Sequence, residues 1–306
     1  MRTLILFNPN AGRGRGQRVA ESVRDLLASR SAHADLFPTA KEPPDAFHAR
    51  LSAAMQGLDL LIVAGGDGTL HSTLPSLLNT AIPVYHLAMG TENLFARQFR
   101  MDRAPETLDR AIKAWRTLDV DAATLSFDTP HPPHPFILMC SLGPDASVIR
   151  RLDAARRGPI SHLSYLKPIL SEVIAPAIPR LTIEVDGERL ADNQPGMAII
   201  ANSRQYAMRI DPACNASMTD GLLDVVFFPA ATRFHLPAWV ALSRLRLHRR
   251  AGVLYRQGRS VRVTCDATAP AAPAYQLDGE CGRHPIAPGA TLTFTVQPRA
   301  LRVLAP

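Results

Sequence analysis

The sequence predicts an α/β amino-terminal half with a parallel sheet, followed by a β-rich half that forms an antiparallel sandwich. Up to about residue 120, short apolar runs alternate with amphipathic ones, which is typical of consecutive βα units. From Val120 onward the strand-like segments are short and alternating, which is typical of antiparallel strands. We assign residues 1–120 to an α/β domain, completed by the chain end at about 297–306, and residues 121–296 to the β-rich domain.

The elements expected in the first half follow one another at the spacing of βα units. Leu4 to Phe7 forms the first strand, and a loop with three glycines follows it. The next helix has apolar residues at helical spacing, at Val19, Val23, Leu26 and Leu27. The alternation continues through Ala34 to Phe37, Ala46 to Met55, Leu58 to Ala64, Leu70 to Leu78 and Ile82 to Leu87. A last helix is expected from Pro105 to Arg116, with one apolar face made of Leu108, Ile112 and Trp115.

The second half is expected to consist of strands that are interrupted by two helical patches. The strands are expected at Thr124 to Phe127, Phe136 to Ser141, Arg180 to Asp186, Ala198 to Ala201, Leu222 to Phe228, Val261 to Thr264 and Thr291 to Val296. The helical patches lie near Asp145 to Arg156 and Ser161 to Val173. Pro-rich turns, such as residues 129–133, mark the connections.

The composition favours a soluble, cytosolic enzyme. Of the 306 residues, 46% are hydrophobic and 20% charged, and the apolar runs are too short to span a bilayer. The first apolar stretch is too short for a signal peptide. The four cysteines are scattered and form no zinc or disulfide pattern. The net charge of +7 suits a nucleotide, a nucleic acid or an acidic lipid surface and does not choose among them.

A glycine-rich loop lies where an α/β protein binds phosphate. Gly65-Gly66-Asp67-Gly68-Thr69 follows an apolar run and precedes a helical stretch, so it lies at the carboxyl end of a buried strand. Each glycine permits φ > 0, which lets main-chain N–H groups converge on an anion. Asp67 can reach a metal ion or a ribose, and Thr69 can cap the next helix. Taken alone, these residues fit an ordinary tight turn equally well.

Four further segments accompany this loop. Asn8-Pro9-Asn10-Ala11-Gly12 ends the first strand, and Gly90-Thr91-Glu92-Asn93-Leu94 follows the fourth. Later come Asp220-Gly221-Leu222-Leu223-Asp224 and Leu277-Asp278-Gly279-Glu280. In this order and spacing, the five segments resemble the diacylglycerol kinase catalytic family, in particular the soluble bacterial lipid kinases related to sphingosine kinases. The resemblance covers nearly the whole chain.

The resemblance implies an ATP-dependent lipid kinase, with a nucleotide-binding domain like those of NAD kinase and diacylglycerol kinase and a lipid-binding β-rich domain. ATP would lie in the cleft between the domains, and its γ-phosphoryl group would pass to a lipid hydroxyl such as that of a diacylglycerol. The transfer needs donors for the phosphates, a metal ion and a base. The nucleotide-binding residues that the resemblance and the loop chemistry indicate are Asn8, Pro9, Asn10, Gly12, Thr39, Gly65, Gly66, Asp67, Gly68, Thr69, Gly90 and Thr91.

Carboxylates are the candidates for the catalytic chemistry. Asp67 and Asp145, the latter in a segment similar to the family's Gly-x-Asp-Ala, are candidates for the site of the Mg²⁺ that accompanies ATP. Glu280 is the candidate general base, because the glycine before it lets the carboxylates of Asp278 and Glu280 approach one site. The alternative for this triplet is a solvated hairpin turn.

The resemblance also implies a separate structural magnesium site. It maps onto the Asp220 carboxylate and the main-chain carbonyls of Ser217 and Leu222. The alternative is that Asp220-Gly221 is a turn before a strand.

The sequence departs from the family pattern at three positions. His71 and Ser72 stand where many members have Asn-Glu, and Leu94 stands where the family has Asp. These changes fit a divergent subfamily, or a catalytically weakened protein that binds nucleotide and lipid. NAD kinase is the other alternative, since it shares the Gly-Gly-Asp-Gly loop, but it lacks the Asn-Pro turn combined with the late Asp-Gly-Glu.

The expected partner is a lipid substrate at a membrane surface, met transiently from the cytoplasm at the inner face of the membrane. The densest basic region is Arg244-Leu245-Arg246-Leu247-His248-Arg249-Arg250, followed by Arg256, Arg259 and Arg262. The interleaved apolar residues could insert shallowly into a bilayer, or the region could be a solvated helix face. Nucleic acid is not an expected partner, because no aromatic-basic platform is present. The sequence leaves open whether the chain forms a homodimer.

Overall fold

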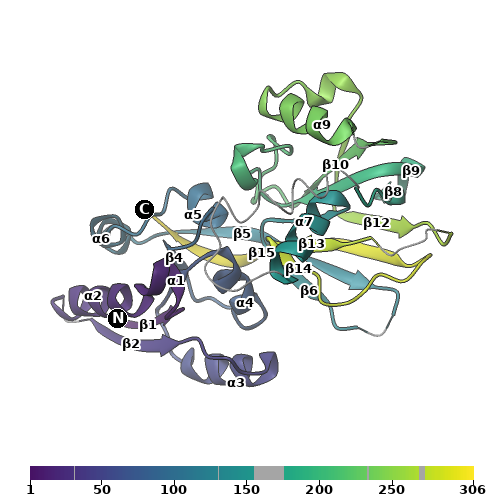
Figure 1. Cartoon of the computed structure of the whole chain (residues 1–306). Coiled ribbons are helices and arrows are strands. Elements are labelled where there is room, and N and C mark those ends of the chain that lie inside the picture. The colour runs from purple at the N-terminus through teal and green to yellow at the C-terminus, as the bar shows by residue number, and fades with distance from the viewer. Residues whose placement is uncertain (31, 130, 155–175, 233, 269–272) are drawn as a thin grey trace. The chain divides into compact units, whose positions relative to one another are not determined.

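The computed structural model describes residues 1–30, 32–129, 131–154, 176–232, 234–268 and 273–306. The chain divides into two compact units, one formed by Met1–Val120 with Arg299–Pro306 and the other by Asp121–Pro298. It leaves the first unit within strand β5 (Arg116–Phe127) and returns within strand β15 (Thr291–Ala305) (Figure 1). None of the helices that the structure describes is both long and apolar enough to cross a bilayer.

The first unit is built on a parallel sheet in the order β2-β1-β3-β4. Val303, near the end of β15, pairs in parallel with Val84 of β4 and extends this sheet. All six residues of β3 are buried, as expected for a parallel strand that is covered on both faces. The strands are β1 (Arg2–Phe7), β2 (His33–Pro38), β3 (Leu60–Gly65) and β4 (Val84–Ala88).

Six helices are described in this unit. They are α1 (Ala11–Gly14), α2 (Gly16–Ala28), α3 (Pro44–Ala54), α4 (Asp67–Leu77), α5 (Leu94–Gln98) and α6 (Pro105–Ala114). The expected glycine loop after β1 contains the helical turn α1. The expected apolar face of α6 is wrong at Trp115, because this residue caps the helix in the left-handed conformation and is 41% exposed. Leu108 is buried as predicted, and Ala111 is buried with it.

The second unit is a β-rich sandwich with antiparallel pairing, as predicted. Its strands are β6 (His134–Phe136), β7 (Met139–Leu142), β8 (Arg180–Val185), β9 (Glu188–Ala201), β10 (Leu223–Pro229), β11 (Leu254–Gly258), β12 (Ser260–Cys265), β13 (Tyr275–Leu277) and β14 (Glu280–Cys281). β7 and β10 both pair with β9, β8 lies between β9 and β12, and β12 pairs with β15. The core contains Phe136, Phe227 and Phe294.

The helical segments of the second unit are α7 (Pro144–Ala154), α9 (His235–Arg244) and the short 3₁₀ helices η2 (Ala207–Arg209) and η3 (His248–Ala251). α7 corresponds to the helix expected near Asp145, and the helix expected at Ser161 to Val173 lies outside the described residues. The single strand expected from Phe136 to Ser141 is two strands. The main-chain N–H groups of Ile137 and Leu138 separate them, since both donate to the Asp278 carboxylate.

Candidate active site

The carboxyl ends of the parallel strands bring three of the predicted segments together. Asn8 N–H, after β1, donates to the Ala64 carbonyl of β3 at 3.2 Å. Thr39 N–H, after β2, donates to the Phe7 carbonyl at 2.9 Å, and Met89 N–H, after β4, donates to Gly65 at 2.9 Å. The predicted nucleotide-binding segments of the first unit therefore begin at one edge of one sheet, which is where α/β folds bind ligands.

The two glycine loops at this edge pack backbone against backbone. A Cβ added to Gly90 would lie 2.7 Å from Gly66 Cα, and one added to Gly65 would lie 2.4 Å from Thr69 Oγ1. The expectation that the glycines of the first loop supply φ > 0 is wrong, because Gly65, Gly66 and Gly68 all lie outside the left-handed region. The role of Gly66 and Gly90 is close approach, because a Cβ on either would push the two loops apart.

The first glycine-bearing turn joins the same edge. Asn8 Oδ1 accepts the Asn10 N–H at 2.9 Å and so forms an Asx turn that leads into α1. Gly12 has φ +58°, and a Cβ there would lie 2.8 Å from the Met89 side chain. Here glycine is needed for both conformation and space.

Asp67 connects the loops through its carboxylate. Asp67 Oδ2 accepts the Leu94 N–H at 2.9 Å, and Oδ1 accepts the Phe95 N–H at 3.1 Å. These two amides belong to the first two residues of α5. The Asp67 carboxylate therefore caps this helix, because the side chain of its N-cap residue, Asn93, makes no capping hydrogen bond. Thr69 does not cap α4 as expected, because the N-cap is Gly66 and Thr69 already lies within the helix.

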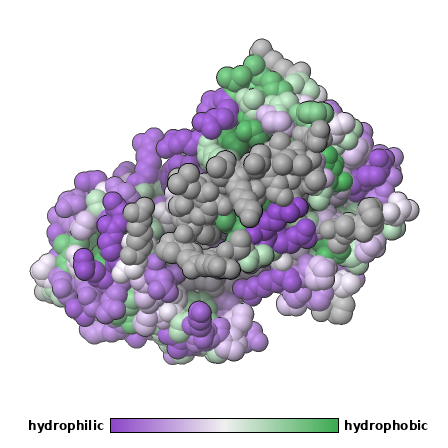
Figure 2. All heavy atoms as spheres, viewed as in Figure 1, coloured by the Kyte–Doolittle hydropathy of each residue, from purple (hydrophilic) through white to green (hydrophobic). Residues whose placement is uncertain are grey.

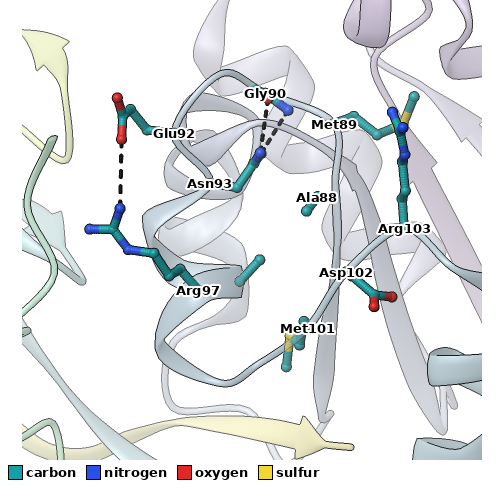
Figure 3. Close-up of a pocket in the computed structure, with 10 residues that line it drawn as sticks. Ala88, Met89, Gly90, Glu92, Asn93, Arg97, Met101, Asp102 and Arg103 are labelled. Carbon is teal, nitrogen blue, oxygen red and sulfur yellow. Dashed lines mark hydrogen bonds and ion pairs between the residues drawn. The ribbon is translucent and has the colours of Figure 1, made fainter. Parts of the chain in front are cut away.

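Asn93, for which no role was predicted, closes the second glycine loop. Its Oδ1 accepts the Gly90 N–H at 2.6 Å, and its Nδ2 donates to the Gly90 carbonyl at 2.8 Å (Figure 3). Asn93 has φ +48°, a conformation that asparagine tolerates better than most residues. The sequence signal for this role of Asn93 is its position three residues after the glycine of a Gly-Thr pair.

His86, which was also not predicted, supports the loop from inside the sheet. Its ring is fully buried, and Nε2 lies 3.0 Å from the Gly65 carbonyl. Burial lowers the pKa of His86, although Asp67 and the Gly65 carbonyl partly oppose this effect. The imidazole is therefore neutral at pH 7 and donates its Nε2–H to Gly65. A polar residue within the apolar strand β4 was the only signal for it.

A pocket of about 440 Å³ opens beside the second glycine loop. In Figure 3, Glu92 and Arg97 form an ion pair of 3.7 Å at one side, while Arg103 extends toward Met89 at the other. The volume lies within the usual range for small-ligand sites. The lining residues are Ala88, Met89, Gly90, Glu92, Asn93, Ala96, Arg97, Met101, Asp102 and Arg103.

Asp145 lies in the first turn of α7 in the second unit. Its Oδ2 accepts the Tyr206 hydroxyl at 2.5 Å, and its Oδ1 is buried with no hydrogen-bond partner among the described residues. Burial raises the pKa of Asp145, and hydrogen bonds from Ser141 and Tyr206 partly offset the rise. A buried carboxylate oxygen of this kind would be stabilised by a cation.

Glu280 begins β14, directly after the hairpin turn Asp278-Gly279. Both turn residues have positive φ, +53° and +87°, as in a type I′ turn. The expected approach of both carboxylates to one site is wrong, because buried Asp278 accepts three main-chain N–H bonds of 2.7–3.1 Å from residues 137–139. The Glu280 side chain is exposed.

The same triplet occurs a second time in this unit. Asp186-Gly187-Glu188 joins β8 to β9, with φ +51° and +86° at its first two residues. Asp186 likewise accepts main-chain N–H groups, from Arg259 and Ser260. The Asp-Gly-Glu sequence thus specifies a hairpin with an anchored aspartate. Any catalytic role of Glu280 must come from its position in the fold.

The loop expected to hold a structural metal is organised by two aspartates. Asp220 Oδ1 accepts the Leu222 N–H at 3.1 Å, and buried Asp121, which the sequence analysis missed, accepts the Gly221 N–H at 2.7 Å. Burial raises the pKa of Asp224, and the Asp220 charge adds to the rise. A cation at Asp220 would relieve that repulsion, which fits the donors expected there.

Ser217 Oγ forms a hydrogen bond with Thr219 in the same loop. Within the described ranges, no three His, Cys, Asp or Glu side chains are grouped as ligands of one metal ion. A magnesium ion would therefore depend on main-chain carbonyls and water for most of its ligands.

Two family models match the chain. Residues 2–125 match the diacylglycerol kinase catalytic domain, and residues 139–305 match the YegS C-terminal NAD kinase beta sandwich-like domain. A Mycobacterium tuberculosis protein named diacylglycerol kinase is 28% identical over 235 residues, covering 76% of this chain and 74% of that protein. An uncharacterized Synechocystis protein is 25% identical over 321 residues, covering 99% of this chain and 70% of that protein.

Solved structures share the fold over the whole chain. A Bacillus anthracis protein provisionally described as a diacylglycerol kinase has a TM-score of 0.76 at 17% identity, covering 100% of this chain and 95% of that chain. A second B. anthracis structure, described as a diacylglycerol kinase, has a TM-score of 0.68 at 15% identity, covering 100% and 96%.

Proposed function

The chain belongs to the bacterial diacylglycerol kinase-like family, and on that premise we propose that it is an ATP-dependent lipid kinase. It transfers the γ-phosphoryl group of ATP to a hydroxyl of a diacylglycerol or a related lipid. The proposal places the reaction at the inner face of the membrane, which the enzyme meets from the cytoplasm.

The observation that carries the proposal is the backbone contact between Gly66 and Gly90. It joins two loops that end adjacent strands, and at the point of contact neither loop carries a Cβ. α4 begins at Asp67, so its first N–H groups, together with the partial positive charge of the helix N-terminus, favour an anion beside the loop. This arrangement suits a polyphosphate.

The remaining nucleotide contacts are assigned to the strand ends around this loop. Strand β1 pairs with both β2 and β3. The residues that follow β1 are Asn8, Pro9, Asn10 and Gly12, and Thr39 follows β2. Arg103, at the pocket next to Gly90, offers a cation to the phosphates.

The chemistry is assigned to carboxylates. Glu280 takes the proton of the lipid hydroxyl, whose oxygen forms a bond to the γ-phosphorus while the bond from that phosphorus to the β,γ-bridging oxygen breaks and ADP leaves. Mg²⁺, when bound, neutralises charge on the phosphates. Asp67 and Asp145 are the proposed carboxylates for it, and Asp220 with the carbonyls of Ser217 and Leu222 would hold a separate structural ion.

One observation favours a second candidate, a nucleotide-binding protein with weakened transfer. Leu94 stands at the family's Asp position, and its N–H is held by Asp67. A carboxylate that the family has near the phosphates is therefore missing. The carboxylate that remains, that of Asp67, already accepts two main-chain N–H groups.

The test is a transfer assay with the wild-type protein, γ-labelled ATP and Mg²⁺. Separate reactions contain extracted bacterial lipids, purified diacylglycerol, a sphingoid base, phosphatidylglycerol or NAD. We expect the label in a lipid product. Label in NADP, or ATP binding without turnover on any acceptor, would contradict the proposal and identify the NAD kinase or the weakened alternative.

A further inference from the structure

The segment from Phe234 to Arg249, which we call the α9 lobe, has an unusual surface for a protein in water. In Figure 1 it forms the projecting end of the second unit beyond β10, and Figure 2 shows hydrophobic side chains gathered there. The exposed large side chains of the lobe are Phe234 (70%), Leu245 (67%), Val240 (43%) and Leu247 (41%). All four lie within 14 consecutive residues, 234–247, whereas surfaces normally expose large apolar residues singly.

The lobe is held in place by its other face. Trp239 Nε1 donates to the Pro229 carbonyl at 2.9 Å, and the Trp239 ring packs on Phe228 with centroids 5.8 Å apart. His248 is buried and its Nε2 donates to the Pro212 carbonyl at 2.9 Å. These contacts pack the inner face of the lobe against the rest of the second unit. The outer residues are therefore exposed even though α9 has its core contacts.

The polarity of α9 is reversed relative to an ordinary surface helix. Between His235 and Arg244 the only Lys, Arg, Asp or Glu is Arg244, at its last position, and exposed Val240 and Ala241 face outward. A helix that lies on a globular protein normally turns charged residues to water. The apolar residues between Arg250 and Arg256 do not add to this face, because Val253 is buried and Leu254 and Tyr255 belong to β11.

Along the chain, the charged residues in and next to the lobe are all basic, and the acidic group near Arg249 is Asp224, which accepts the Tyr255 hydroxyl. Residues 225–265 contain eight arginines and no Asp or Glu. Arg244 and Arg246 flank the exposed Leu245, and neither has an ion pair among the residues that the structure describes. Arg249 stacks over the Tyr255 ring at 4.1 Å. The complementary partner is therefore apolar at its centre and negatively charged around it.

We propose that the α9 lobe docks on the headgroup region of an anionic lipid bilayer. Phe234 and Leu245 enter the boundary between headgroups and acyl chains, while Arg244 and Arg246 lie at the lipid phosphates. The choice of a bilayer over an acidic protein rests on the proposed function, because a lipid kinase must reach a substrate whose acyl chains lie in a membrane. The choice of surface rests on the exposed residues and their charge alone.

The test is vesicle sedimentation without nucleotide, so that it is independent of catalysis. Vesicles are phosphatidylcholine alone or equal parts of phosphatidylcholine and phosphatidylglycerol. The lobe variants are Phe234→Ser/Leu245→Ser and Arg244→Gln/Arg246→Gln. Matched controls in the first unit are Trp115→Ser/Leu118→Ser, which have about 40% exposure, and Arg18→Gln/Arg24→Gln on the exposed face of α2. Circular dichroism melting verifies that each variant is folded.

We expect the wild type to sediment with the anionic vesicles, to be released by high salt, and to bind neutral vesicles weakly. Each lobe variant should lose about tenfold or more in vesicle affinity, and the controls should stay within about twofold. Equal binding of lobe variants and wild type, or no binding of the wild type to anionic vesicles, would overturn the proposal. So would a lobe variant that dissolves a homodimer in light scattering while vesicle binding persists. A wild type that binds vesicles but fails the transfer assay would refute the kinase and leave the docking surface intact.

Discussion

At the scale of single residues, the role proposed for Asp145 conflicts with the stability of the fold. Its buried Oδ1 has no hydrogen-bond partner among the described residues, and burial raises its pKa. A carboxyl whose pKa is higher in the folded chain stabilises the fold while it is protonated. That contribution is complete below the ordinary value of 3.8 and is lost as the pH rises through the raised value.

Asp145→Asn should therefore stabilise the protein at pH 7 in the absence of metal ions. We expect a gain on the order of 1 kcal/mol in the free energy of unfolding, because asparagine can still accept the Tyr206 hydroxyl without burying a charge. Urea denaturation of both proteins at pH 7 and at the lowest pH where both stay folded measures it. The gain should shrink at the lower pH. A variant that is less stable than the wild type at pH 7 would show that the ionised carboxylate is compensated in the fold.

At the scale of elements, the two Asp-Gly-Glu hairpins separate local structure from function. Both have the same turn and an aspartate that holds the main chain of another segment. They differ in burial, since Asp278 is 3% exposed and Asp186 is exposed. Loss of a hydrogen bond to a buried carboxylate costs more free energy than loss of one to an exposed carboxylate. The main-chain N–H groups left behind in a buried site have no water molecules to bond to.

Asp278→Asn should destabilise the protein by about 3 kcal/mol, and Asp186→Asn by about 1 kcal/mol or less. The reason is that an amide leaves one or two of the buried amides of residues 137–139 without an acceptor. Chemical denaturation of both variants under one set of conditions provides the measurement. Equal losses would mean that burial of the anchor does not control the stability of these hairpins.

The sequence predicted the elements better than it predicted the contacts among them. The parallel strands and the β-rich half followed from periodicity, and the position of the glycine loops followed from the strands that they end. Close approach of Gly66 to Gly90, and the division of one expected strand by Asp278, depend on residues far apart in the chain. Asn93, His86 and Asp121 act through tertiary hydrogen bonds, for which local pattern gives almost no signal.

At the scale of the whole molecule, the chain has the two-domain plan of its family but departs from it in detail. The two family models together extend from residue 2 to residue 305. The α9 lobe was expected only as a basic region, because the helical pattern of residues 235–244 has no polar face to identify it. The lobe and the glycine loops belong to different units, so we expect that substitutions can alter the proposed membrane docking and the proposed nucleotide binding separately.

The most direct test of the account compares Glu280→Gln with Glu188→Gln in lipid phosphorylation. The two glutamates follow the same hairpin turn, and Glu188 is occupied in an exposed ion pair with Arg256, of little energetic consequence. We predict that wild type and Glu188→Gln label lipid from γ-labelled ATP at similar rates, whereas Glu280→Gln folds normally and loses about 100-fold or more of the rate. No labelled lipid from the wild type, or a Glu280→Gln rate within a few-fold of it, would contradict the account.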